Sequence, residues 1–240
     1  MHRFFVNPSN ITDNICIDGT DVNHIKNVLR LKCGEEVNVC DGRNNEYLCK
    51  ISNISPDKVY LDIISKDICE NEPEFSVTLY QGLPKSDKME YIVQKCVELG
   101  VTRIVPVAAK RSVVKLKDDA KKVARWQKIA HEAAKQCQRG ILPEVTGVMT
   151  FKEAIIDLAK NDLAFMPYES ERQTSLRAVL TKKDVKSIGF FIGPEGGLDE
   201  TEVAMADEMN IPTVSLGKRI LRTETAPISC LSAVMYELDW

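Results

Sequence analysis

Two segments in the last third of the chain carry the residues best suited to chemistry. The sequence GPEGGL at 193–198 and the sequence LGKRILRTETA at 216–226 each follow an apolar run. Glycines let a backbone approach a ligand closely and expose its amide groups. The second segment adds apolar, cationic, acidic and hydroxyl side chains. Together the two segments predict a ligand pocket.

Neither segment matches the glycine patterns that bind nucleotide phosphates. Both lack the dinucleotide pattern G-x-G-x-x-G and the Gly-Lys-Ser or Gly-Lys-Thr of a phosphate-binding loop. A glycine-rich turn is weak evidence by itself, because glycine also closes ordinary turns. The residues therefore predict a pocket without a phosphate group, and they leave the ligand unidentified.

The predicted elements around these segments explain how they would meet. From residue 74 onward strands alternate with helices, and the strands are predicted at 77–81, 103–107, 163–166, 188–192 and 213–216. Thr150 with Glu153, and Asp199 with Glu202, form capping boxes that begin two of the helices. Such alternation predicts an α/β layer with a mainly parallel sheet, whose ligands lie beyond the carboxyl ends of the strands.

The first part of the chain is predicted to be β-rich. Short strands are expected at 3–6, 15–17, 37–40, 47–51 and 59–64, with one helix at 22–30 capped by Asp21. This spacing is typical of a small barrel. An acidic, aperiodic stretch at 65–73 separates the parts, so we expect domains at 1–70 and 74–240.

Composition limits the classes of protein. The chain has 240 residues, a net charge of −3 and 44% hydrophobic residues, which is typical of a globular protein. No membrane span or signal peptide is evident, so we expect a cytoplasmic protein. The eight cysteines form no C-x-x-C pair and have no histidine at ligand spacing. Free, mostly buried thiols and no metal site are expected.

One stretch of the chain is strongly basic. From Lys110 to Arg139 the chain has ten Lys or Arg residues and only three acidic residues, Asp118, Asp119 and Glu132. Such a stretch indicates either a solvated helix face or a nucleic-acid-binding surface, and charge alone favours the solvated face.

The segments resemble the SPOUT class of RNA methyltransferases, and more closely its RsmE family of 16S rRNA uracil-N3 methyltransferases. The resemblance covers nearly the whole chain and is most specific at 193–197 and 216–226. It also includes MHRFFV at 1–6, HIKNVLR at 24–30, QGLPKSDKME at 81–90, RSVV at 111–114 and EAAKQ at 132–136. Ser86 stands where the family pattern has glycine, a minor departure.

The resemblance implies a fold that residue patterns do not. It implies a SPOUT-type α/β domain with a C-terminal trefoil knot, preceded by a small PUA-like β-barrel domain, and a homodimer whose partner closes the pocket. General topology rules would instead favour an unknotted doubly wound sheet. The implied cofactor is S-adenosylmethionine. Its expected binding residues are Met166, Glu169, Gly193, Gly196, Gly197, Leu216, Gly217, Ile220, Leu221, Thr223 and Thr225.

The implied reaction is methylation of N3 of one uridine in 16S rRNA. N3 is a poor nucleophile while protonated, so a base or a cationic stabiliser is needed. Arg222 and Glu224 are the candidates, and an ion pair that only shapes the loop is an equal alternative. RNA phosphates are expected at Arg3, Arg30, Lys85, Arg111, Lys135 and Arg139.

Three other functions deserve comparison. A related SPOUT enzyme acting on another rRNA position or on tRNA fits the amino-terminal segments less well. A non-catalytic RNA-binding protein would not need the intact segments 193–197 and 216–226. A nucleotide-dependent metabolic enzyme would normally need the phosphate-binding motif that is missing here.

Overall fold

The protein divides into two compact units. The computed structural model describes residues 1–112, 119–181 and 184–239. Val113 and Val114 of the family-like segment, and Lys115, Lys117 and Asp118 of the basic stretch, therefore lie outside the described residues. The first unit comprises Met1–Glu72 with Ala134–Leu142, and the second comprises Pro73–Ala133 with Pro143–Trp240. Residues 134–142 therefore belong to the first unit, although the expected boundary had placed them in the second.

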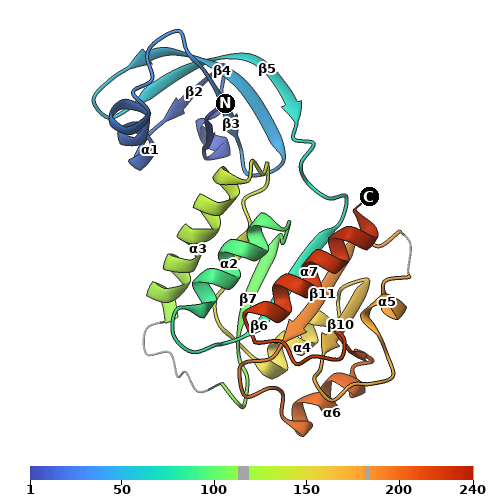
Figure 1. Cartoon of the computed structure of the whole chain (residues 1–240). Coiled ribbons are helices and arrows are strands. Elements are labelled where there is room, and N and C mark those ends of the chain that lie inside the picture. Colours follow the sequence, from blue (N-terminus) through green and yellow to red (C-terminus); the bar gives the residue numbers. More distant parts are fainter. Residues whose placement is uncertain (113–118, 182–183, 240) are drawn as a thin grey trace. The chain divides into compact units, whose positions relative to one another are not determined.

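The first unit is built on a five-stranded sheet in the order β1-β3-β4-β5-β2 (Figure 1). Only β1 and β3 pair in parallel, and β4 and β5 carry two register shifts. The apolar core includes Phe4, Ile15, Val37 and Leu61. The strands are β1 (Arg3–Phe5), β2 (Asn14–Ile17), β3 (Glu36–Cys40), β4 (Asn45–Ile54) and β5 (Val59–Ile68).

The helix predicted at 22–30 differs from the structure in two ways. The helical stretch begins with α1 (Thr20–Asn23) and continues as a π-helical segment, η2 (His24–Leu29). A short 3-10 turn, η1 (Pro8–Asn10), precedes it. Gly19 rather than Asp21 occupies the N-cap position. The Asp21 carboxylate is instead bound by Lys135, at 2.8 Å, so the expected cap was wrong.

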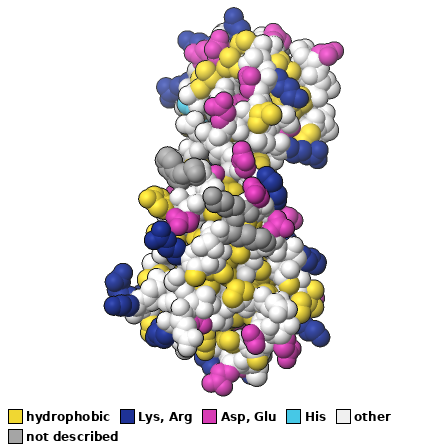
Figure 2. All heavy atoms as spheres, turned by 90° about the vertical axis from the view of Figure 1, so that its right-hand side faces the viewer, with side chains coloured by type: hydrophobic (Ala, Val, Ile, Leu, Met, Phe, Trp, Pro, Cys, Tyr) yellow, Lys and Arg dark blue, Asp and Glu magenta, His cyan; other side chains and the backbone are white. Residues whose placement is uncertain are grey.

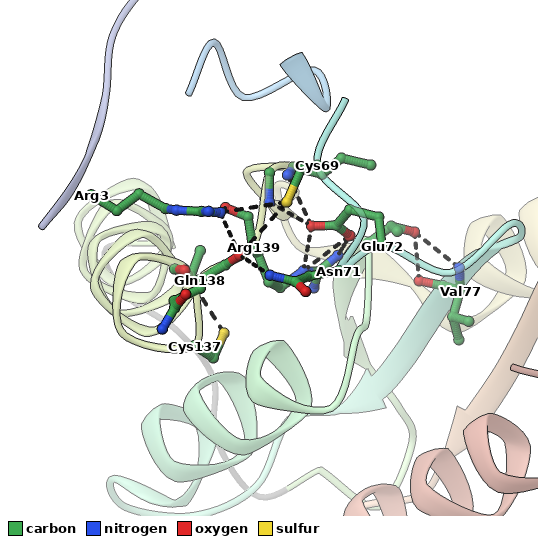
Figure 3. Close-up of polar contacts among 12 residues, drawn as sticks. Arg3, Cys69, Asn71, Glu72, Val77, Cys137, Gln138 and Arg139 are labelled. Carbon is green, nitrogen blue, oxygen red and sulfur yellow. Dashed lines mark hydrogen bonds and ion pairs between the residues drawn. The ribbon is translucent and has the colours of Figure 1, made fainter. Parts of the chain in front are cut away.

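A buried ion pair holds the segment 134–142 to the rest of the first unit. The Arg139 guanidinium binds the Glu72 carboxylate at 2.7 Å, and the two side chains are 4% and 2% exposed (Figure 3). The same carboxylate accepts the backbone N–H groups of Gly140 and Ile141, each at 2.9 Å. Arg3 adds hydrogen bonds to the carbonyls of Gln138 and Arg139.

The second unit contains an all-parallel sheet in the order β12-β10-β11-β6-β7-β8, with the short strand β9 also paired to β7. The predicted parallel sheet is thus confirmed. Its strands are β6 (Ser76–Gly82), β7 (Arg103–Ala108), β8 (Glu144–Val145), β9 (Met149–Thr150), β10 (Leu163–Pro167), β11 (Ser187–Ile192) and β12 (Thr213–Val214). Tyr80, Phe151, Ile155 and Phe191 lie in its apolar core.

Helices cover this sheet. Figure 1 shows α2 beside α7, and these two helices contact each other, as α4 and α6 do. Both predicted capping boxes, Thr150 with Glu153 and Asp199 with Glu202, are present. The helices are α2 (Lys88–Glu98), α3 (Asp119–Gln136), α4 (Phe151–Leu158), α5 (Leu176–Val179), α6 (Glu200–Glu208) and α7 (Thr225–Leu238).

The surface and the cysteines carry few special features. Lys/Arg and Asp/Glu side chains are interspersed on the face seen in Figure 2. Among the described residues, every helix is too short or too polar to span a membrane, and no three metal-ligating side chains cluster together.

All eight cysteines are free thiols, and five of them are buried. Burial raises the pKa of Cys49 to about 11 and that of Cys40 to about 12.

Removing one partner of the buried pair should destabilise the first unit. For Arg139→Ala we expect the free energy of unfolding to fall by about 3–5 kcal/mol, because Glu72 is left as an unpaired buried charge. Chemical denaturation with a first-unit probe measures it. Lys66→Ala, which removes an exposed ammonium over the Tyr47 ring in the same unit, is the control and should cost at most about 1 kcal/mol. Equal effects of the two substitutions would contradict this reading.

Candidate functional site

A pocket of about 490 Å³ opens at the carboxyl ends of β10, β11 and β12. These strands are neighbours in the sheet, so the loops that follow them meet although they are far apart in sequence. The loops 167–172, 192–198 and 215–223 form most of its wall, with Lys88 of α2 and Ala226 of α7. The pocket therefore lies where ligands of parallel sheets bind, as the two segments predicted.

Two glycines allow the loop after β11 to pack closely. A Cβ on Gly82 would come within 2.6 Å of Pro194 Cδ. Gly197 has a φ of +69°, and a Cβ there would collide with the Glu169 carboxylate. Larger residues at either position would displace the loop, because side chains disfavour positive φ and atoms cannot overlap.

A hydrogen-bonded chain joins the two predicted segments. The Thr223 hydroxyl donates to the carbonyl oxygen of Gly193 at 2.8 Å and accepts from Gln81 Nε2 at 3.2 Å. Gln81 is fully buried at the end of β6, and its Oε1 has no hydrogen-bond partner among the described residues. The segment 216–226 is thereby attached to both β6 and the loop after β11.

Lys88 joins two carboxylates at the edge of the pocket. Its ammonium lies 2.9 Å from Glu195 Oε1 and 3.1 Å from Glu224 Oε2. The hydrogen bonds to Glu195 and Glu224 raise the pKa of Lys88. Partial burial acts to raise the pKa values of both carboxyl groups, but hydrogen bonds, including those from Lys88, outweigh it and lower them. All three groups are therefore charged at neutral pH.

The loop after β10 is held by one carboxylate. Glu171 accepts hydrogen bonds from the backbone N–H groups of Gln173 (2.6 Å) and Thr174 (3.0 Å) and from the Thr213 hydroxyl (2.8 Å). The backbone N–H of Thr174, then that of Gln173 and the Thr213 hydroxyl, lower the pKa of Glu171 to about 2. This carboxylate therefore links the loop after β10 to the start of β12.

Most of the residues expected to bind the cofactor line the pocket. They are Glu169, Gly193, Gly196, Gly197, Leu216, Gly217, Ile220, Leu221 and Thr223, together with the candidate Arg222. Met166 does not, because its side chain is fully buried in the core. Thr225 begins α7 and lies outside the wall, as does Glu224, which pairs with Lys88.

Sequence reasoning missed part of the wall. Several missed residues are direct neighbours of predicted ones, and only the tertiary structure brings Lys88 and Arg172 to the pocket. Lys88 lies within the family-like segment 81–90, but nothing in that segment marks it as a pocket residue, and no local motif marks Arg172. The missed residues are Lys88, Pro167, Tyr168, Arg172, Ile192, Pro194, Glu195, Leu198, Ser215, Arg219 and Ala226.

The six residues expected to bind RNA fall into two groups. Arg30, Lys85 and Arg111 are exposed. Arg139 is buried against Glu72, and the Arg3 side chain is 6% exposed and bound to Glu46. Lys135 is paired with Asp21. The expectation for Arg3 and Arg139 is therefore corrected: their guanidinium groups hold the first unit together and are not available to phosphates. The Lys135 ammonium is bound by Asp21 and is therefore largely unavailable to phosphates as well.

Glu171 should remain ionised to an unusually low pH. Because its folded pKa of about 2 lies below the ordinary 4.5, the ionised form stabilises the fold above pH 4.5, and this stabilisation is lost as the pH falls towards 2. Carboxyl NMR titration measures the pKa directly. The stability difference between the wild-type protein and Glu171→Gln should shrink over the same range. A pKa near 4.5 would show that these hydrogen bonds do not persist in solution.

Known proteins confirm the resemblance seen in the sequence. The chain matches the RNA methyltransferase domain over residues 70–235 and the RNA methyltransferase PUA domain over residues 17–64. It is 40% identical to ribosomal RNA small subunit methyltransferase E of Bacillus subtilis, over 93% of this chain and 90% of that protein. The Neisseria gonorrhoeae protein of that name, solved bound to S-adenosyl methionine, is 33% identical, with a TM-score of 0.89 over 99% of this chain and 98% of that one. The chain belongs to the ribosomal RNA small subunit methyltransferase E family of RNA methyltransferases.

Proposed function

We propose that this protein transfers a methyl group from S-adenosylmethionine to N3 of one uridine in 16S rRNA of the small ribosomal subunit. The pocket formed by segments 193–198 and 216–223 at the carboxyl ends of three parallel strands carries this proposal. Two relatives support the proposal. The Bacillus subtilis and Neisseria gonorrhoeae proteins are both named ribosomal RNA small subunit methyltransferase E, and the Neisseria gonorrhoeae protein was solved bound to S-adenosyl methionine.

The residues present fit this cofactor. A pocket of about 490 Å³ is in the range of small-molecule sites. Leu216, Ile220 and Leu221 provide apolar wall for an adenine ring, and Gly193 and Gly197 contribute to the same wall. When bound, S-adenosylmethionine supplies the methyl group from its sulfonium centre.

The chain must also prepare the uracil. N3 lies on the pairing edge of the base, so the uridine has to be unpaired or flipped out to reach the pocket. Arg222 lines the pocket and is exposed, and we assign it to stabilising negative charge on the ring. Glu224, the second candidate, lies outside the pocket wall and pairs with Lys88, which keeps its carboxylate ionised. A lowered pKa makes it a weak base, so we assign it to the ion pair that shapes the loop.

The knot and the homodimer belong to the same proposal. The segment 215–224 leaves the sheet edge at β12, and α7 then packs against α2, which follows the central strand β6. The hydrogen bond from Thr223 to Gly193 supports a C-terminal segment tucked beneath the loop after β11. Exposed Tyr91 of α2 and Tyr236 of α7 are proposed as part of the dimer interface. We place the reaction in the cytoplasm, with its rRNA substrate, and assign it no metal.

Gly82→Ala should weaken cofactor binding without unfolding the chain. The added Cβ would press on Pro194 and shift the loop that carries Gly193 and Gly197. We expect an affinity loss of roughly ten-fold or more for S-adenosylhomocysteine by calorimetry, because about 1.4 kcal/mol of lost interaction is a factor of ten. Gly147→Ala is the matched control, since a Cβ there meets nothing within 4 Å. Unchanged affinity in Gly82→Ala would argue against this pocket as the cofactor site.

Methyl transfer to small ribosomal subunits tests the function itself. Subunits from a strain that lacks this methylation are incubated with the protein and S-adenosylmethionine, and the rRNA is mapped by primer extension. A new stop at a single uridine near the 3′ end of 16S rRNA is expected, because a methyl group at N3 blocks base pairing. Methyl transfer without that stop would show that the protein methylates another atom or another RNA. Absence of cofactor binding would overturn the proposal.

A further inference from the structure

The pocket wall carries more positive charge than its own carboxylates neutralise. Lys88, Arg172, Arg219 and Arg222 line it, against Glu169 and Glu195, although the chain as a whole has a net charge of −3. Lys88 is already paired with Glu195 and Glu224. With the three arginines, all exposed, the wall has four cations and two carboxylates, and one net positive charge remains when Glu224 is counted as well.

Two of these arginines have guanidinium groups left for a ligand. Arg172 donates one hydrogen bond, from Nη1 to the carbonyl of Glu171 at 3.3 Å. Within the described parts of the chain, Arg219 has no hydrogen-bond or ion-pair partner. Each guanidinium has five N–H donors, so both have donors to offer to an anion.

The backbone holds these two arginines on adjacent, connected loops. Ser215 N–H donates to the carbonyl of Thr174 at 2.8 Å, and Leu176 N–H donates to the carbonyl of Ser215 at 3.2 Å. The Glu171 carboxylate adds the hydrogen bond from Thr213. Arg172 precedes this junction by two residues and Arg219 follows it by four. A fixed junction lowers the entropic cost of presenting two long side chains to one ligand.

The positive charge of Arg172 and Arg219 favours a polyanionic ligand over the cofactor. S-adenosylmethionine has a sulfonium, an ammonium and one carboxylate, so its net charge is positive and an excess of arginine beside it is unfavourable. A ribose–phosphate chain is negatively charged, so it is attracted to the same arginines, and the paired N–H groups of a guanidinium match the spacing of two phosphate oxygens.

We propose that Arg172 and Arg219 form a clamp for the backbone phosphates that flank the target nucleotide. This proposal rests on the proposed function.

Binding of unmodified small ribosomal subunits tests the clamp. The protein loaded with S-adenosylhomocysteine is titrated by filter binding at several salt concentrations. For the Arg172→Ala, Arg219→Ala double variant we expect affinity to fall roughly ten-fold or more and the log–log salt slope to shrink by about one to two, since each lost phosphate contact removes up to about one unit. Affinity for S-adenosylhomocysteine should fall far less than affinity for the subunits.

Two further variants act as controls. Lys218→Ala removes an exposed cation beside Arg219 that does not line the pocket, and it should retain most of the affinity. Arg219→Lys keeps the charge and should recover part of the loss. Wild-type salt dependence in the double variant would overturn the clamp. So would a loss of S-adenosylhomocysteine affinity with subunit binding intact, which would assign the arginines to the cofactor carboxylate.

Methyl transfer by the wild-type protein separates the two proposals. If the wild-type protein methylates the subunits while the double variant binds them equally well, only the clamp fails. If the wild-type protein neither binds nor methylates them, the proposed function fails and the clamp with it.

Discussion

The hydrogen bonds that join Gln81, Thr223 and the Gly193 carbonyl are the contact on which the pocket depends. They connect the end of a central strand, the glycine-rich loop and the segment that leads into α7. They act together with the ion pairs of Lys88, which join Glu195 of the loop after β11 and Glu224 of the segment after β12 to α2. Because Gln81 and Thr223 are buried, leaving either unpaired would carry a desolvation cost, which favours this one arrangement of the loops.

Electrostatics adds a second layer to the same wall. Lys88 pairs with two carboxylates at one edge, whereas the loops after β10 and β12 present arginines that form no ion pair within 4.0 Å among the described residues. Glu171 is ionised because of backbone and hydroxyl donors and fixes a loop instead of neutralising the arginine beside it. Fixed dipoles and charges of this kind are set before a ligand arrives, which is how a site stabilises charge at low cost.

The first unit shows how a charge can be misread from sequence. Arg3 and Arg139 were both expected to bind RNA phosphates, but the side chain of each binds a carboxylate and is almost fully buried. A guanidinium can be buried only when its donors are satisfied, and the partners Glu46 and Glu72 lie far away in sequence. Sequence position shows that a cation exists but not which carboxylate it meets.

The sequence by itself determined the alternation of strands and helices, both capping boxes, the parallel sheet and the two segments that form the pocket. These features are local: periodicity, caps and glycine spacing act over a few residues. The tertiary structure alone decided that Lys88 and Arg172 reach the pocket, that Met166 turns into the core and that residues 134–142 join the first unit. Those outcomes depend on strand order and on contacts between distant residues, which no short pattern encodes.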